Sequence, residues 1–174
     1  MRKFLLGASI ALATVAVPAA HAASPASGDV SESHLVQTWS GEADGQPMNN
    51  SPETETHQLC LQPFCDTFTL NVKDKGTALK VRFDAPSSAG FVDVLVTKPD
   101  GSSELVGGNQ DDNFNEIEYD GADLSTGTYT FDIWTNQVYG VLAGPYDAQA
   151  TLCSATVARA DCFPPPPDDE EGDA

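Results

Sequence analysis

Apolar and polar residues alternate along the middle of the chain. An alternation of this kind places the apolar side chains on one face and the polar side chains on the other, which is typical of a half-buried β-strand. Four regular series lie at 67–72, 79–84, 129–134 and 146–152, and four less regular segments lie at 35–41, 91–97, 103–106 and 114–119. No segment carries a clear apolar stripe at helical spacing. About eight short strands with Gly-, Asn- and Asp-rich links predict an all-β fold, an antiparallel β-sandwich.

One turn can be predicted in detail. Lys98-Pro99-Asp100-Gly101 joins the 91–97 strand to the 103–106 strand. Proline fixes the first central φ, aspartate suits the second central position, and glycine accepts the position that follows. The sequence therefore predicts a type I turn and a well-specified hairpin.

The first residues differ in composition from the rest. Residues 1–22 begin with Arg2 and Lys3, continue as an apolar run and end on Ala20-His21-Ala22, a pattern that predicts a secretory signal cleaved after Ala22. The apolar run is shorter than the roughly 20 residues that cross a bilayer. We therefore expect an exported mature chain, secreted across the cytoplasmic membrane, that does not insert into a membrane.

The mature chain divides into three zones. Residues 23–33 are small and polar and predict a flexible lead-in, whereas 34–162 carry nearly all the large apolar side chains and predict the sandwich domain. Residues 163–174 read FPPPPDDEEGDA, in which the prolines favour extended geometry and the like charges repel one another. We expect a disordered acidic tail, and we favour a solvated end over a docking segment.

The chain is strongly acidic. It carries 26 acidic residues against 8 Lys and Arg residues, a net charge of −18, which becomes −20 when the signal is lost with Arg2 and Lys3. Such an excess repels phosphate backbones and argues against a nucleic-acid partner. Solubility in an extracellular or saline medium is the favoured account of the charge, and attraction of calcium or of a basic protein is the alternative.

All four cysteines belong to the mature chain, and an even number in an exported protein predicts two disulfides. The spacings C-x4-C and C-x8-C, without nearby histidines, disfavour a zinc site. Of three pairings, we favour Cys60–Cys65 and Cys153–Cys162, because Pro63 can turn the short first loop back on itself. Each local loop would contribute about 2–3 kcal/mol of stability.

The loop at 109–116 is the best candidate for metal chemistry. Asp111, Asn113 and Asn115 match the first, third and fifth positions of an EF-hand loop. The glycine needed at the sixth position and the glutamate needed at the twelfth are missing, so an EF-hand is excluded. A looser calcium site, with ligands Asp111, Asp112, Asn113 and Asn115, is the alternative to the solvated loop that we favour.

Aromatic residues suggest a second kind of site. Trp134 lies on the polar face of its strand, where an exposed indole would stack on a sugar ring, with Tyr139 nearby in sequence. We favour the alternative that the segment 137–145 covers Trp134. Trp39, near the first strand, is expected in the core.

Catalytic motifs are missing from the sequence. It contains neither a G-x-S-x-G elbow nor an H-E-x-x-H helix. The mature chain has two histidines, His34 and His57, both outside the regular strands, and its cysteines are expected to be oxidised. A nucleophile would therefore lack a positioned base, and we expect no enzymatic activity.

Several strand motifs resemble the bacterial pre-peptidase C-terminal domain family. DVLVTKPDG at 93–101 resembles the family's "DLYVYDPDG", and GTYTF at 127–131 is similar to its "GTYYV". Residues 146–152 resemble its closing strand and 66–70 its opening strand, so that the likeness spans Cys65 to Leu152. The resemblance implies a jelly-roll-like, non-catalytic sandwich of secreted proteins that aids secretion, targeting or polymer binding, and whose relatives can bind calcium.

Two classes of function remain open. The first is a secreted binding module that engages an extracellular protein or polysaccharide through one face of the sandwich or its loops. The second is a structural or solubilising accessory for the export or stability of another protein. Exposed aromatics around Trp134 and Tyr139 would favour the first class, and a uniformly acidic surface would favour the second. A protease inhibitor is a third option, for which we identify no rigid exposed loop.

Overall fold

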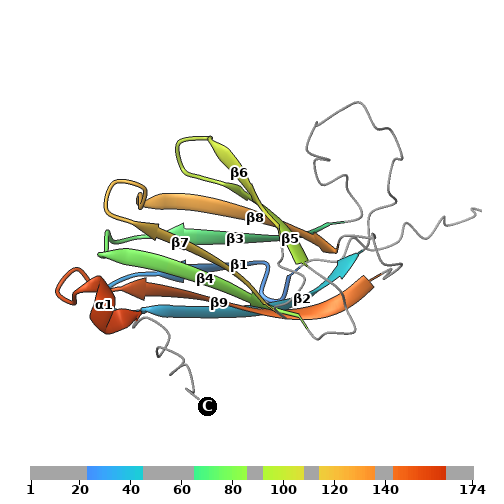
Figure 1. The fold of residues 1–174 in the computed structure, drawn as a ribbon, viewed down its shortest axis with the longest axis horizontal. Coiled ribbons are helices and arrows are strands. Elements are labelled where there is room, and N and C mark those ends of the chain that lie inside the picture. Colours follow the sequence, from blue (N-terminus) through green and yellow to red (C-terminus); the bar gives the residue numbers. More distant parts are fainter. Residues whose placement is uncertain (1–22, 45–64, 86–91, 108–113, 136–142, 164–174) are drawn as a thin grey trace, which may run out of the picture.

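The computed structural model describes residues 23–44, 65–85, 92–107, 114–135 and 143–163. Within these ranges the chain forms nine strands in two layers and one short helix (Figure 1). The elements are β1 (Ser27–Val30), β2 (Val36–Asp44), β3 (Asp66–Val72), β4 (Ala78–Asp84), β5 (Val92–Thr97), β6 (Ser103–Val106), β7 (Phe114–Asp120), β8 (Gly127–Thr135), β9 (Ala143–Cys153) and α1 (Arg159–Cys162). None of the described helices is long and apolar enough to span a bilayer.

The strands form two sheets that pack against each other. The five-stranded sheet has the order β1-β3-β8-β5-β6, and the four-stranded sheet has the order β2-β9-β4-β7. Every named pair of neighbours is antiparallel except β1 and β3, which are parallel. The predicted antiparallel β-sandwich is confirmed, and all eight predicted strands are present.

The core lies between the two sheets, where the apolar residues of the alternating strands meet. Trp39 of β2 stacks on Phe68 of β3 with ring centroids 3.8 Å apart, and it meets Phe83 of β4 edge-on at 5.7 Å. Phe83 also contacts Phe131 of β8, at 5.9 Å. These rings come from both sheets, so they join the layers at the centre of the sandwich, and the expectation that Trp39 is a core residue is confirmed.

The prediction that residues 23–33 form a flexible lead-in is wrong, because these residues contain the strand β1. β1 runs parallel to β3, and backbone bonds Thr69 N to Ala26 O and Lys73 N to Val30 O hold it there. Val30 is fully buried. Since β1 reads Ser-Gly-Asp-Val, it lacks the alternating apolar residues by which a strand is predicted, and pairing with β3 makes it a strand instead.

The predicted hairpin between β5 and β6 is present. Gly101 N donates to Lys98 O at 2.9 Å, which closes the four-residue turn. Gly101 has φ +85°, a conformation that glycine adopts without strain. The side chain of Asp100 accepts hydrogen bonds from the backbone N and the hydroxyl of Ser102 at 2.9 and 2.6 Å. The turn residues therefore determine the register of β5 and β6.

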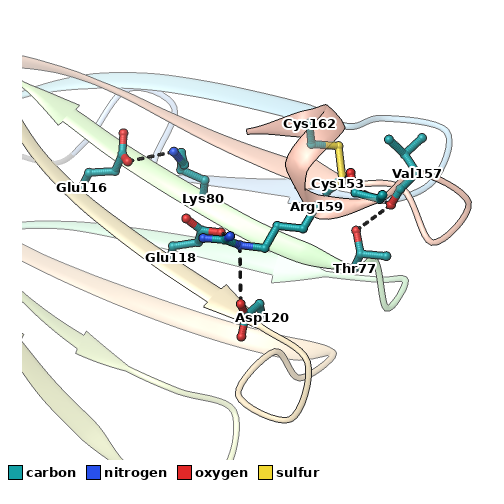
Figure 2. A network of polar contacts seen from close by, with 10 residues as sticks. Thr77, Lys80, Glu116, Glu118, Asp120, Cys153, Val157, Arg159 and Cys162 are labelled. Carbon is teal, nitrogen blue, oxygen red and sulfur yellow. Dashed lines mark hydrogen bonds and ion pairs between the residues drawn. A yellow bond between two sulfur atoms is a disulfide. The ribbon is translucent and has the colours of Figure 1, made fainter. Parts of the chain in front are cut away.

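The chain after β9 folds back and is tied to that strand. A disulfide joins Cys153 to Cys162, as predicted (Figure 2). Beside it, the Thr77 hydroxyl donates to Val157 O at 3.0 Å. Cys65 is also disulfide-bonded, whereas Cys60, its predicted partner, lies outside the described residues, so that this pairing stays a prediction.

Replacing both Cys153 and Cys162 by serine is expected to lower the free energy of unfolding by about 2–3 kcal/mol, because the loop that they close is short. Urea denaturation of the double variant measures the loss. Peptide mapping without reductant provides the control on pairing, and it should also show a Cys60–Cys65 link. A crosslink between Cys60 and Cys153 would contradict the local arrangement.

Candidate binding surface

Trp134, the candidate for sugar stacking, is buried. Its exposed fraction is 7%, so the indole does not offer a ring face to solvent, whereas its coverage by the segment 137–145 stays a prediction. Tyr139 and most of the 137–145 segment lie outside the described residues. Within the described part of the chain, the large exposed apolar side chains are aliphatic: Leu35, Val36, Leu105 and Val157.

Asn115, one of the four candidate calcium ligands, has a structural role at the sandwich edge. It is 7% exposed, and its amide nitrogen donates to Val92 O and Val106 O, both at 3.1 Å. These bonds connect β7 of one sheet to β5 and β6 of the other. Asp111, Asp112 and Asn113 lie outside the described residues, so a calcium site in the loop stays a prediction. Among the described residues there is no group of three His, Cys, Asp or Glu side chains that could hold a metal ion.

The most buried polar group described is the carboxylate of Asp66, at the start of β3, with an exposed fraction of 0%. The Tyr146 hydroxyl, from β9 in the other sheet, donates to its Oδ2 at 2.6 Å. Burial and this carboxylate raise the pKa of Tyr146 well above its usual range. A Cβ on Gly41 would lie 1.7 Å from Asp66 Oδ2, so the missing side chain of Gly41 makes room for the carboxylate. The group is enclosed in protein and therefore connects the sheets without offering a reactive atom to solvent.

The outer face of the four-stranded sheet is charged. Lys80 pairs with Glu116 across β4 and β7 at 2.8 Å, and α1 extends over one end of the face (Figure 2). Arg159 of α1 forms an ion pair with Glu118 and a second one with Asp120 at 3.5 Å. The face is thus occupied by paired charges and partly covered by the C-terminal segment.

A hollow of about 470 Å³ lies on the same face, next to β2. The carboxylates of Asp84 and Asp147, which are opposite each other on β4 and β9, contribute to its wall together with Ser24 and Ser40. Asp84 accepts a hydrogen bond from Arg82 Nε at 2.8 Å. The hollow is therefore an acidic depression whose charge is partly neutralised by Arg82.

The outer face of the five-stranded sheet differs, because hydroxyl groups cross it in a single row. The register aligns one residue from each strand, and we call this set the hydroxyl row: Ser27, Thr69, Thr130, Thr97 and Ser103. All five are exposed or half-buried. With strands about 4.8 Å apart, the row extends about 19 Å across the sheet.

Apolar and acidic side chains flank the hydroxyl row. Leu95 and Leu105 lie opposite each other in the next row, and Leu105 is 41% exposed. Asp132 of the same row accepts a hydrogen bond from the Thr67 hydroxyl at 2.7 Å. Asp29, on the other side, is paired with Lys73 at 2.6 Å. The hydroxyl row itself is therefore uncharged, with threonine methyls and the two leucines beside its hydroxyls and the carboxylate of Asp132 in the next row, in a chain with a net charge of −18.

The hydroxyl row was missed by reasoning from sequence alone. Threonine recurs at alternate positions of β3 and β8, and this is a visible signal. The row itself depends on the strand order and on the register, which bring together residues as distant as Ser27 and Thr130. Neither is readable from the alternation of single strands.

No protein-family model matches the chain, and no curated protein matches it at a significant level. Among solved structures it is similar to the pre-peptidase C-terminal domain of a collagenase from Bacillus anthracis, with 13% identity and a TM-score of 0.45, over 72% of this chain and 94% of that chain. It is also similar to a periplasmic inhibitor of g-type lysozyme from Aeromonas hydrophila, with 13% identity and a TM-score of 0.39, over 72% and 95%. Neither similarity carries a ligand or a partner over to this chain. The first of these structures belongs to the family that the strand motifs around Lys98 and Tyr129 resemble.

Proposed function

We propose that the protein is an exported, non-catalytic β-sandwich module that binds another protein through the outer face of its five-stranded sheet. Export is supported by the signal pattern of residues 1–22, with cleavage after Ala22, and by the disulfide between Cys153 and Cys162. Disulfides persist in oxidising compartments.

The hydroxyl row is the single observation that carries the binding role. An uncharged, partly apolar strip can be desolvated at lower cost than a surface of carboxylates, so it is suited to the centre of an interface. The strip lies on a sheet, whose side chains are held by regular strands. A partner would therefore lose little free energy in ordering the surface that it contacts.

A protein partner is favoured over a polysaccharide by the side chains on this face. Sugar rings stack on exposed aromatic side chains, whereas Trp134, the described aromatic residue on this side of the sheet, is buried. Leu95 and Leu105 next to the hydroxyl row suit apolar contact with a protein surface. Among the described residues, the carboxylate of Asp66 is enclosed in protein and His34 is exposed. We therefore identify no nucleophile with a positioned base in this part of the chain, which supports a non-catalytic role.

A charge-reversal experiment tests this function. Mature protein carrying Thr69→Lys and Thr130→Lys is immobilised and exposed to medium from the producing cells, beside wild-type protein. The matched control carries Thr38→Lys and Thr151→Lys, which place the same charges on the outer face of the other sheet. We expect wild-type protein and the control to capture the same protein, and the hydroxyl-row variant to lose at least tenfold in affinity.

Two outcomes would contradict the proposal. Equal capture by all three proteins would mean that the hydroxyl row is not the contact surface. Capture of carbohydrate without protein would favour the polysaccharide alternative. Melting temperatures of the variants show whether each one is folded before the binding comparison is made.

A further inference from the structure

We propose that the α-ammonium group freed at Ala23 by signal removal pairs with the buried carboxylate of Asp66, so that processing itself stabilises the folded sandwich. This inference depends on the cleavage after Ala22 that the proposed function includes. It assigns a role to a segment that the binding surface does not use, namely the residues immediately after the cleavage point.

The start of the mature chain is part of the fold. Ser24 and Ser40 of β2 exchange two backbone hydrogen bonds, of 2.8 and 3.2 Å, in an antiparallel bridge. Ala23 is 3% exposed and belongs to the core cluster. A new terminus at Ala23 would therefore be anchored at the edge of the four-stranded sheet, with its side chain directed into the protein.

The register of this bridge brings Ala23 next to Asp66. In an antiparallel pair, the residues flanking a hydrogen-bonded pair are opposite each other with Cα atoms about 4.5 Å apart, so Ala23 is opposite Gly41. Gly41 is the residue against which the Asp66 carboxylate packs, since a Cβ there would lie 1.7 Å from Oδ2. Ala23 and Asp66 thus approach the same glycine, one from the neighbouring chain segment and one from the opposite sheet.

Charge makes this approach favourable after cleavage. A fully buried carboxylate is costly unless hydrogen bonds and an opposite charge compensate it. Tyr146 supplies a neutral donor to Asp66 at 2.6 Å. The peptide nitrogen of Ala23 in the uncleaved chain is neutral, whereas the freed amine is a cation. The described ionisable groups on the strands around this edge include Glu42 on β2, Asp147 on β9 and the pair of Arg82 and Asp84 on β4.

Acetylation of the mature terminus isolates the charge. An acetyl group on Ala23 removes the positive charge and is close in size to the Ala22 carbonyl and Cα that precede it in the uncleaved chain. We expect acetylation to lower the melting temperature of the mature protein by several degrees. The loss should persist in Asp147→Asn, the matched control beside Ser40, and should nearly vanish in Asp66→Asn. An equal loss in all three backgrounds, or no loss in any, would overturn the inference.

The pKa of the free amine provides a readout that needs no variant. An α-amino group ordinarily has a pKa near 7.7–8.0, and a carboxylate partner raises it. Because the folded value would exceed the unfolded one, the added stability is complete below about pH 7.7 and is lost as the pH rises through the folded pKa. NMR titration of the ¹⁵N-labelled Ala23 amine measures it. An ordinary or lowered pKa in the folded protein would contradict the pairing.

N-terminal sequencing of exported protein separates this inference from the proposed function. A terminus at Ala23, together with an acetylation effect that is present in the wild-type protein and lost in the Asp66→Asn variant, supports the pairing. A terminus at Ala23 without that effect overturns the pairing alone and leaves export intact. A terminus elsewhere, or an intact Met1, overturns the cleavage on which both depend.

Discussion

Replacement of Trp39 by alanine is expected to lower the free energy of unfolding by about 3–5 kcal/mol, the range measured for large aromatic residues in well-packed cores. The indole is 3% exposed and stacks on Phe68 at 3.8 Å, while its edge contacts Phe83. Its removal would leave a cavity between rings that come from opposite sheets. Equilibrium denaturation in urea, followed by circular dichroism, measures the loss.

Trp134→Ala is the matched control for this prediction. Trp134 is also buried, with an exposed fraction of 7%, but it does not belong to the core cluster between the sheets. We expect a clearly smaller loss for Trp134→Ala than for Trp39→Ala. Equal losses would mean that Trp39, between the two sheets, contributes no more to the free energy of unfolding than Trp134 does.

Gly41→Ala is expected to destabilise the protein by about 3–5 kcal/mol, although it adds one methyl group. The new Cβ would lie 1.7 Å from Asp66 Oδ2 and 2.7 Å from the Tyr146 hydroxyl, so the buried carboxylate would have to move. Overpacking costs about 1–3 kcal/mol. Loss of a hydrogen bond to a charged group adds about 1.5–3 kcal/mol.

Gly107→Ala provides the control for the same chemical change. Among the described residues, a Cβ at Gly107 would meet only Asp93 Oδ1 within 4 Å, at 3.5 Å, which is an ordinary contact. Denaturation of both variants should show a change within about 0.5 kcal/mol for Gly107→Ala, as for most surface positions. A comparably small change for Gly41→Ala would contradict the close approach of Asp66 to β2.

The strands could be predicted from sequence because most of them obey a simple rule. In β3, β4, β8 and β9 the apolar residues recur at every second position, and one sheet face is buried. β1 does not obey it: Gly28 and Asp29 leave no apolar face, and the strand exists because β3 offers a free edge. Local pattern therefore predicts strands that bury their own side chains, and fails for strands that depend on a neighbour.

The candidate sites were less predictable, because each depends on contacts between distant segments. The acidic loop suggested that Asn115 is a metal ligand, but the pairing of β7 with β4 puts its amide beside Val92 O and Val106 O. Trp134 occurs at a polar position of β8 and is nevertheless covered. The hydroxyl row requires the register of five strands. A sequence specifies these arrangements only through the complete fold.

The central claim, that the hydroxyl row is the contact surface, is tested most directly by NMR on mature protein labelled at its threonine methyls. Captured partner is titrated in, and the methyl resonances of both outer faces are followed. Thr69, Thr97 and Thr130 report on the hydroxyl row, and Thr38 and Thr151 report on the opposite face. We predict shifts or broadening at the first three and none at the last two. Changes confined to Thr38 and Thr151, or to neither face, would contradict the claim.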